Sequence, residues 1–501
     1  MLEMLMDGLA NILALKPMLL IFAGVVLGLI FGAIPGLTAT MAIAICLPIT
    51  YTMGPIHGMA LLMGLYIGGV SGGLVPAILL NLPGTPSSIA TTFDGYPMAK
   101  KGEAGKAFGF AIVSSFIGTL LGIIVLMTIS PALAKFALKF GPFEYFAVSI
   151  FALTLIASLS EGSLVKGLLS GLLGLSLAMV GSAPIDAYPR FTFGFDALDG
   201  GFNLLPALIG LFAVSEVFKI AERKIKKQKD VDYRMKGLGF TAKELFQQSW
   251  NMLRSALIGI GIGILPGIGG GTANILSYIA AKNQSKYPEK FGKGIPDGIV
   301  ASETSNNAAI GGALVPLLSL GIPGDTVTAM LLGGLIIHGL TPGPLLFQQN
   351  GDVVYGIFAS LIIANIAMIV VLYLGMRSFV KLLRIPQYIL LPIILALCAV
   401  GAFGVNNRIF DVGSLLAFGV IGYVLIKAKF PLTPIILGFI LGPIAETSLR
   451  RGLMLSQGDF TAFFTSPIAA TFLIVAVLSI AIKAFRNVRK RRRSSTIAPP
   501  L

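Results

Sequence analysis

Two apolar stretches of this chain end in the same Pro-Gly break, and polar side chains follow each break. Gly72–Gly84 (GGLVPAILLNLPG) and Gly312–Gly324 (GALVPLLSLGIPG) share seven of thirteen residues at a spacing of 240 positions. Proline removes a backbone donor, so a regular helix cannot continue through either break. In a membrane, such a break survives only inside protein or beside a water-filled cavity, and a duplicated one points to a transporter's binding site.

The groups around the breaks suit an anion and a small cation. Amides at the start of the next helix favour anions, and hydroxyls add neutral donors, so a carboxylate can be held without a buried arginine. We expect the substrate to be bound by residues at or near the breaks: Asn81, Thr85, Ser87, Ser88, Asn306, Asn307, Gly324 and Thr326. Freed carbonyls at the preceding helix ends suit Na⁺, and the residues expected to bind the ion there are Asn81, Pro83, Gly321 and Asp325. Alternatively, each Pro-Gly is a kink whose hydroxyls bond back to their own helix.

The most polar run within the apolar background is Ala301–Gly312 (ASETSNNAAIGG). Its residues Glu303, Asn306 and Asn307 fall within about one helical turn, so two of them share a face. Acids inside a membrane are costly and are functional by default. Glu303 is therefore a candidate ion site, for a proton or a cation, and the two asparagines are candidates for hydrogen bonds to substrate. The alternative is that Glu303 lies at the cytoplasmic boundary, because lysines precede it closely in the sequence.

Composition indicates a polytopic α-helical membrane protein. Hydrophobic residues make up 55% of the 501 residues and charged residues only 12%, against about 25% in soluble domains. Apolar stretches near the length of a bilayer span recur from Pro17 to Phe485. The two cysteines and two histidines lie far apart in sequence, so we expect no structural zinc, haem or disulfide framework. The N-terminus lacks the basic start of a cleaved signal peptide.

Further repeated landmarks divide the chain into two halves. Ile34-Pro35-Gly36 pairs with Leu265-Pro266-Gly267, and the offsets of all landmarks run from 228 to 243 positions. We expect a first half at residues 1–220, a linker at 221–252, a second half at 253–446, an extra transmembrane helix at 447–485 and a tail at 486–501. Seven crossings per half, an odd number, give the halves opposite orientations. The expected fold is thus two inverted repeats with broken helices or hairpins, plus one extra C-terminal helix.

Most of the net charge of +15 lies in the linker and the tail. Lys219–Arg254 holds ten basic and four acidic residues, and Lys483–Arg493 holds seven basic residues and no acid. Nucleic-acid binding is one interpretation of such a tail. Beside membrane helices, the positive-inside rule and anionic lipid headgroups explain it better. Both segments, and hence the C-terminus, are expected in the cytoplasm, with lipids rather than nucleic acid as partners.

A glycine-rich stretch, Gly259–Gly271 (GIGIGILPGIGGG), has seven glycines without the spacing of a dinucleotide-binding loop. Close packing between helices is the favoured interpretation. The alternative is that Pro266–Thr272 and the matching loop Pro35–Thr38 also approach the ligand.

Three long segments carry a resemblance to a known family. They are FGAIPGLTATMAIAICLPITY, ILLNLPGTPSSIATTFDGYPMAKKGEAGKA and SKYPEKFGKGIPDGIVASETSNNAAIGGALVPLLSLGIPGDTVTAMLLGGLIIHGLTPGPLLF. They closely resemble the large membrane subunit of tripartite tricarboxylate transporters, the TctA family, from about Pro17 to Phe485. The resemblance implies a bacterial inner-membrane importer of citrate or other carboxylates, usually driven by Na⁺, that works with a small four-helix membrane subunit and a periplasmic substrate-binding protein. Related folds place substrate at paired hairpin tips, here Asn81–Ser88 and Gly321–Thr328, and move a transport domain against a scaffold, the elevator type of alternating access.

Two other classes of protein, an intramembrane enzyme and a channel, fit the sequence less well. The apolar segments contain no HExxH motif, no Asp-rich Mg²⁺ cluster and no Ser-His pairing, so an intramembrane enzyme is disfavoured and no cofactor is expected. A channel needs a continuous polar pore, whereas the polar groups here concentrate at two breaks and one asparagine-rich helix.

Overall fold

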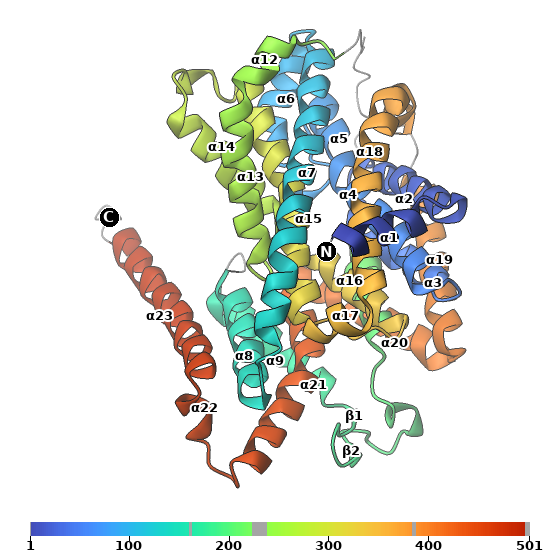
Figure 1. Cartoon of the computed structure of the whole chain (residues 1–501), viewed down its shortest axis with the longest axis vertical. Helices are drawn as coiled ribbons and strands as arrows, with labels where there is room; N and C mark the ends of the chain where they lie inside the picture. The colour runs from blue at the N-terminus through green and yellow to red at the C-terminus, as the bar shows by residue number, and fades with distance from the viewer. Residues whose placement is uncertain (1, 160–162, 223–237, 383–386, 496–501) are drawn as a thin grey trace. The chain divides into compact units, whose positions relative to one another are not determined.

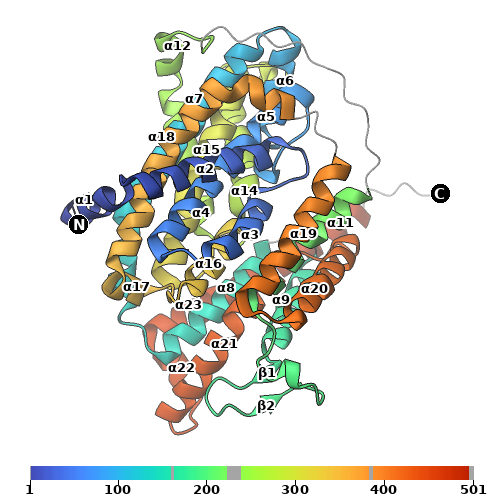
Figure 2. The same cartoon turned by 90° about the vertical axis from the view of Figure 1, so that its right-hand side faces the viewer.

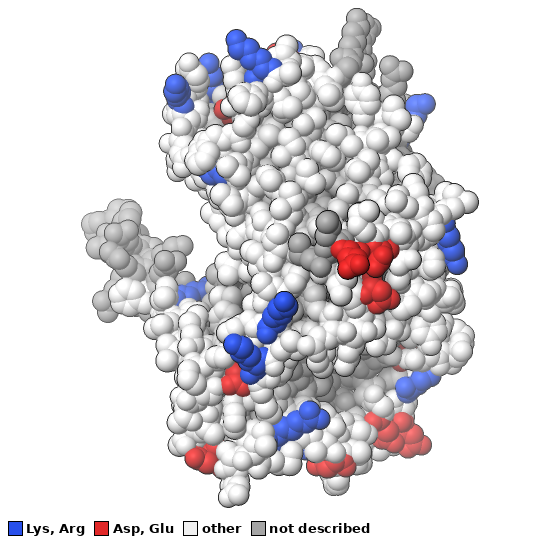
Figure 3. All heavy atoms as spheres, in the orientation of Figure 1, with Lys and Arg blue, Asp and Glu red and all other residues white. Residues whose placement is uncertain are grey.

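The structure, a computed structural model, describes residues 2–159, 163–222, 238–382 and 387–495. These residues are mainly helical and include nine helices that are long and apolar enough to cross a membrane. The face drawn in Figure 3 has wide stretches with neither acidic nor basic side chains, as expected where helices meet lipid. The predicted class, an all-α polytopic membrane protein, is confirmed.

The helices form two compact units, and each is built from both halves of the sequence. Unit 1 comprises residues 1–138 and 208–423. Figure 1 labels its elements: α1 (Leu2–Ile12), α2 (Leu15–Ala33), α3 (Ala39–Thr50), α4 (Pro55–Gly72), α5 (Leu74–Leu80), η1 (Pro86–Ser88), α6 (Thr91–Lys100), α7 (Ala104–Ala137), η3 (Gly210–Val214), α11 (Ser215–Ala221), α12 (Ala242–Gln247), α13 (Ser249–Ile264), α14 (Gly269–Gln284), η4 (Pro288–Lys290), α15 (Pro296–Leu320), α16 (Thr326–Ile337), α17 (Pro344–Gln349), α18 (Gly351–Leu382), α19 (Gln387–Asn406) and α20 (Ile409–Lys427), whose last residues pass into the next unit.

Unit 2 comprises residues 139–207 and 424–501. Its elements are α8 (Pro142–Leu159), α9 (Leu164–Ala178), the two-residue strands β1 (Gly181–Ser182) and β2 (Pro189–Arg190), η2 (Asp196–Leu198), α10 (Leu204–Ile209, which ends in unit 1), α21 (Leu432–Leu455), α22 (Ala462–Thr465) and α23 (Pro467–Ser495). Strands β1 and β2 pair antiparallel. Arg190 on β2 forms two hydrogen bonds with the Glu446 carboxylate on α21.

The predicted segment boundaries fall on this structure as follows. Helix α21 runs through the boundary at residue 446, and α23 continues through the boundary at residue 485. Of the linker, residues 223–237 lie outside the described residues, and so do residues 496–501 of the tail. The described end of the linker packs on α7: the Phe240 and Phe110 rings stack with centroids 4.5 Å apart, and Lys106 donates a hydrogen bond to Glu244. That bond lowers the pKa of Glu244 to about 2. The pair therefore stabilises this contact fully at pH values above the ordinary pKa of a glutamate, and the stabilisation is lost as the pH falls to about 2.

The broken helices form the centre of unit 1 because glycines let their neighbours approach closely. Helix α4 packs against α2, and α15 packs against both α7 and α13. A methyl group on Gly24 of α2 would collide with the Leu61 carbonyl oxygen on α4, and one on Gly259 of α13 would collide with the Ser305 carbonyl oxygen on α15. Small residues at such crossings give van der Waals contact between backbones, and Gly259 and Gly263 of the glycine-rich stretch pack in this way.

The two halves of unit 1 lead to opposite ends. Helix α6 follows the first break, and α17 follows the second break and helix α16. In both Figure 1 and Figure 2, α6 lies toward the upper end of the unit and α17 toward the lower end. This agrees with the inverted orientation predicted from the odd number of crossings.

We expect Gly24→Ala to destabilise the folded protein by about 1–3 kcal/mol, because the added methyl group forces α2 and α4 apart. Gly404→Ala is the matched control, since Gly404 lies in helix α19 with open space where a methyl group would be placed. Thermal unfolding of the two purified variants in detergent measures the difference, and equal midpoints would contradict the packing argument.

Candidate functional site

The two breaks share the same backbone features where their helices end. Each helix ends at a left-handed residue, Asn81 with φ 56° and Gly321 with φ 73°. The next amide then bonds back to the helix: Leu82 N donates to Pro76 O at 3.4 Å, and Ile322 N donates to Pro316 O at 3.2 Å. All three pairs are 240 positions apart, so the sequence repeat is a structural repeat at this point.

The helix that follows each break also starts in the same way. Thr85 N donates to Ser88 Oγ at 3.3 Å, and Asp325 N donates to Thr328 Oγ1 at 2.8 Å. Each of these hydroxyls in turn donates to the carbonyl oxygen of its partner, at 3.0 Å in both breaks. Asp325 also caps the helix that follows, because its Oδ1 accepts the Thr328 amide at 2.7 Å. This bond is charge-assisted, whereas Thr85 at the matching position carries no charge.

The first break packs against the start of α14, which belongs to the second half. A methyl group on Gly270 would lie 3.3 Å from Ser87 Cβ and 2.8 Å from Asn306 Oδ1, and one on Gly271 would lie 3.2 Å from Pro86 O. The glycines thus bring the first-turn amides of α14 beside the first break and Asn306. Unpaired first-turn amides are the groups that favour an anion.

The second break packs against helix starts of both halves. Thr326 Oγ1 on α16 lies 3.2 Å from Thr40 Oγ1 on α3, so two helix N-termini meet there. Gly267 N donates to Gly324 O at 2.7 Å, and a methyl group on Gly269 would lie 3.3 Å from Asp325 Cβ. Because Ser87 and Asp325 adjoin consecutive glycines of α14, the two breaks converge at the start of this helix. The loop before α14 thus adjoins the second break, and its contact with a ligand stays a prediction.

Asn306 is buried without a hydrogen-bonding partner. Its side chain is 1% exposed, and neither its Oδ1 nor its Nδ2 has a partner among the described residues. Its counterpart 240 positions earlier is Tyr66, whose hydroxyl donates to Asp325 Oδ2 at 3.0 Å. Of the two matched residues, Tyr66 therefore forms a hydrogen bond with the second break, and Asn306 presents a free amide to the first break. An unpaired buried amide costs about 1–3 kcal/mol, and a carboxylate with a second polar group would satisfy it.

Asn307 and Glu303 are committed to partners within the protein. Asn307 Oδ1 accepts the Ser71 hydroxyl of α4 at 2.7 Å, and its Nδ2 donates to Glu303 O at 3.0 Å. The Glu303 carboxylate accepts hydroxyls from Thr91 of α6 and Ser115 of α7. Both residues are 0% exposed, so Glu303 lies in the interior of unit 1.

The breaks differ in how far they are covered. Asn81, Leu82 and Pro83 are exposed at the first break, with Leu82 41% exposed. At the second break Gly321 and Pro323 are buried, and a methyl group on Gly321 would lie 2.9 Å from Pro342 O in the loop after α16. Of the expected ion ligands, Asn81 and Pro83 are therefore exposed on this chain, whereas Gly321 is buried.

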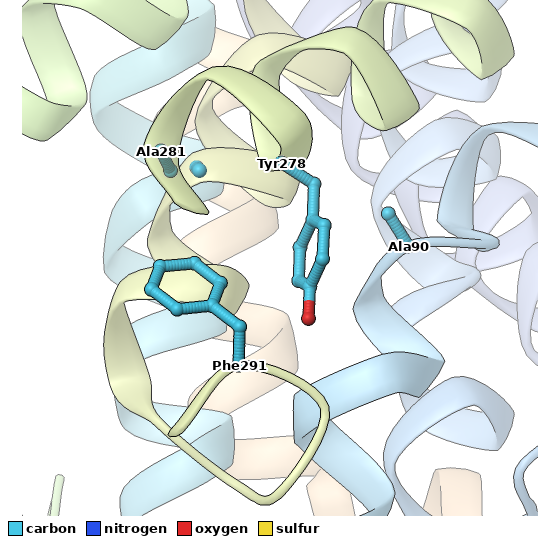
Figure 4. Close-up of a cluster of buried hydrophobic side chains, with 5 residues drawn as sticks. Ala90, Tyr278, Ala281 and Phe291 are labelled. Carbon is cyan, nitrogen blue, oxygen red and sulfur yellow. The ribbon is translucent and has the colours of Figure 1, made fainter. Parts of the chain in front are cut away.

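A second polar contact joins the halves beyond the first break. The buried Asp94 of α6 accepts three backbone amides with Oδ1, from Gly292 at 2.9 Å, Gly294 at 2.8 Å and Ile295 at 3.1 Å. Its Oδ2 accepts the Tyr278 hydroxyl at 2.9 Å. Figure 4 shows the Tyr278 ring lying among Ala90, Ala281 and Phe291. This contact fixes α6 to the loop between α14 and α15.

Sequence reasoning named the residues of the breaks but missed the groups that meet them from other elements. Tyr66, Thr40 and Asp94 were not among the candidates. One signal was available for Tyr66, because the spacing of 240 positions maps Asn306 onto it.

One family model matches this chain, and two relatives are similar to it. The family model described as "Tripartite tricarboxylate transporter TctA family" matches residues 18–437. The "Uncharacterized 52.8 kDa protein in TAR-I ttuC' 3'region" of Agrobacterium vitis is 38% identical over 471 residues, which cover 94% of each chain. The "Uncharacterized protein in TAR-II ttuC' 3'region" of the same organism is 38% identical over 231 residues, covering 46% of this chain and 96% of that one. No solved structure shows a significant match.

Proposed function

Because this chain belongs to the tripartite tricarboxylate transporter TctA family, we propose that it is the large membrane subunit of a secondary transporter that imports carboxylates such as citrate with Na⁺. Its partners are a small four-helix membrane subunit and a periplasmic substrate-binding protein. It lies in the bacterial inner membrane with its C-terminus in the cytoplasm. The proposal rests above all on Asn306, a buried free amide at the point where two matched helix breaks converge.

One carboxylate group is bound by the first break in this proposal. The first-turn amides of α14 and the Asn306 amide donate to its oxygens, and the Ser87 hydroxyl adds a neutral donor. A second carboxylate or hydroxyl group of the substrate is bound between Thr40 and Thr326, where α3 and α16 begin. No Lys or Arg is required, because helix N-termini supply the positive potential.

Sodium is bound on the other side of each break, as a co-transported substrate. The last carbonyls of α5 and α15 lack the partners they would have in a continuous helix, and Asn81 and the Asp325 carboxylate add oxygen ligands. Substrate charge and ion charge then offset each other across the breaks. This arrangement favours binding of the two together, which is the condition for coupled transport.

Alternating access is of the elevator type in this proposal, with unit 1 as the moving part. Both breaks, α14 and Asn306 lie within unit 1, and unit 2 contains none of these elements. A unit that contains the whole binding site can carry it as a rigid body, so no part of the site has to be dismantled during transport.

The test is uptake of radiolabelled citrate and other carboxylates into proteoliposomes that contain both membrane subunits, with the binding protein added outside. We expect Asn306→Ala to lower uptake at subsaturating substrate by about 10- to 100-fold, because hydrogen bonds to charged groups contribute about 1.5–3 kcal/mol. Asn365→Ala is the matched control: Asn365 is also buried, but it lies on α18 and donates to Phe116 O.

Two results would contradict the proposal. Wild-type uptake that ignores the Na⁺ gradient would remove sodium coupling. Equal uptake by Asn306→Ala and Asn365→Ala would remove the substrate site from the start of α14.

A further inference from the structure

We propose that Glu303 is a proton-binding site, separate from the sodium sites at the breaks, and that one proton is carried with each transported carboxylate. The inference rests on the proposed transport function, and it adds a second coupling ion and a site for that ion. It starts from the position of the side chain, which lies in the N-terminal half of α15 and is 0% exposed.

The carboxylate is enclosed by neutral groups. The Thr91 hydroxyl donates to Oε1, the Ser115 hydroxyl donates to Oε2 at 3.0 Å, and Asn307 Nδ2 lies 3.5 Å from Oε2. Thr91 Oγ1 is also 3.2 Å from the Ser302 hydroxyl. Hydroxyls can both donate and accept, so this enclosure accommodates the ionised carboxylate as acceptor and the neutral acid as donor.

No described cation lies within ion-pairing distance of Glu303. Several charged or titratable groups of the helices packed on α15 have other partners: Asp94 of α6 with Tyr278 of α14, Lys106 of α7 with Glu244, Arg254 of α13 with Gln284 and Asn251, and Tyr66 of α4 with Asp325 before α16. Lys100 of α6 lies over the Tyr96 ring. An unpaired buried charge is costly and is normally neutralised by a proton. The missing charge partner is thus the proton itself.

The acid is not required by packing. Its counterpart in the first half is Met63 of α4, 240 positions earlier, which is also 0% exposed. The run Ser302–Asn307 corresponds to Leu62–Ile67 (LMGLYI), in which the only hydrogen-bonding side chain is that of Tyr66. The counterpart helix, α4, therefore folds in the same unit with an apolar side chain at this position. Glu303 is an addition to one half only, and its cost calls for a function.

Glu303 is also connected to the substrate site. It lies one helical turn before Asn306, and Asn307 joins its backbone carbonyl to Ser71 of α4. In the proposed step the carboxylate takes up one proton on an Oε atom and becomes a neutral acid, and the same O–H bond breaks on release to the other side. No other bond changes. Neutralising this side chain beside the site removes repulsion toward an incoming carboxylate.

The first test uses the complete assembly in proteoliposomes with a pH-sensitive dye inside. We expect wild-type protein to acidify the lumen when carboxylate enters, and Glu303→Gln and Glu303→Met to transport without that acidification. Glu303→Met copies the residue of the first half, so it keeps the packing. Glu144→Gln is the matched control, a buried acid in unit 2 whose partners are Gly141 N and Ser466. Acidification that persists in both Glu303 variants would overturn the proposal, whereas absence of uptake by wild-type protein would instead overturn the proposed function.

The second test needs no transport. Infrared difference spectra of the purified protein across a pH titration should contain the carbonyl band of a buried protonated carboxyl, and Glu303→Gln should lack it. Ser115→Ala should keep the band and move its midpoint to higher pH, because a hydroxyl donor favours the ionised form. A band that Glu303→Gln retains, or that does not change with pH, would show that Glu303 does not exchange a proton. A band removed only by Na⁺ at constant pH would assign the site to sodium and likewise overturn the proposal.

Discussion

Replacing Asp325 with threonine should abolish sodium-driven uptake while the second break stays folded. The change copies Thr85, the residue at the same position of the first break, where the following helix starts with the same hydrogen bonds to a hydroxyl three residues on. The backbone geometry therefore tolerates threonine, and the change removes the carboxylate together with its hydrogen bond from Tyr66. Removing one partner of a buried charge pair costs about 3 kcal/mol or more, so we expect sodium-driven uptake to fall by about 100-fold or more.

The readout for Asp325→Thr is initial uptake over a range of Na⁺ concentrations, together with the thermal unfolding midpoint of the purified variant. Asp411→Thr is the matched control, because Asp411 is a buried acid near the start of α20 that accepts Asn406 Nδ2 at 2.8 Å. It should keep the wild-type dependence on Na⁺. If Asp325→Thr keeps that dependence too, Asp325 binds no ion and its roles are to cap α16 and to accept the Tyr66 hydroxyl.

The parts of the site predictable from the sequence are those encoded locally. Pro83-Gly84 and Pro323-Gly324 interrupt helices by removing a donor, and this follows from the residues themselves. The hydroxyl or acid after each break also has a local role, since Asp325 caps the helix that starts one residue later. The duplication gives further information, because two copies of one break predict paired sites even without a structure.

The rest depends on contacts between segments far apart in sequence. Nothing local in Gly269–Gly271 shows that these glycines admit the first break and Asn306, and nothing in Tyr66 shows that its hydroxyl reaches Asp325 across 259 positions. Asn306 and Asn307 are adjacent and alike in type, yet one is free and the other is fully engaged. Which of two neighbouring asparagines is available is decided by the helices around them. A polar pattern alone assigns both to the substrate.

The division into units also could not be read from the repeat. The repeat divides the chain in the middle, whereas the compact units take residues 139–207 from the first half and 424–501 from the end of the chain. Internal symmetry is a property of the sequence, and compactness is a property of which apolar faces meet. A repeated sequence therefore determines the symmetry, whereas packing determines which helices form each unit.

Asp94→Ala should cause the largest loss of stability among changes outside the breaks. Three backbone amides donate to one oxygen of this buried carboxylate, and Tyr278 donates to the other. Alanine leaves all of them without an acceptor, and each unsatisfied buried donor costs about 1–3 kcal/mol. We therefore expect a loss of about 4 kcal/mol or more in the free energy of unfolding.

Asp94→Asn distinguishes the contribution of the hydrogen-bond acceptor from that of the negative charge. Its amide oxygen can still accept the amides of Gly292, Gly294 and Ile295, so we expect a loss of only about 1–2 kcal/mol, the charge-assisted part of the bonds. Thermal unfolding in detergent measures both variants, and hydrogen exchange reports on the three amides directly. In Asp94→Ala those amides should lose protection while the amides of α2 and α4 keep theirs. Retained protection in the loop, or equal stability of the alanine and asparagine variants, would mean that α6 is held by apolar packing around Tyr278 and not by the carboxylate.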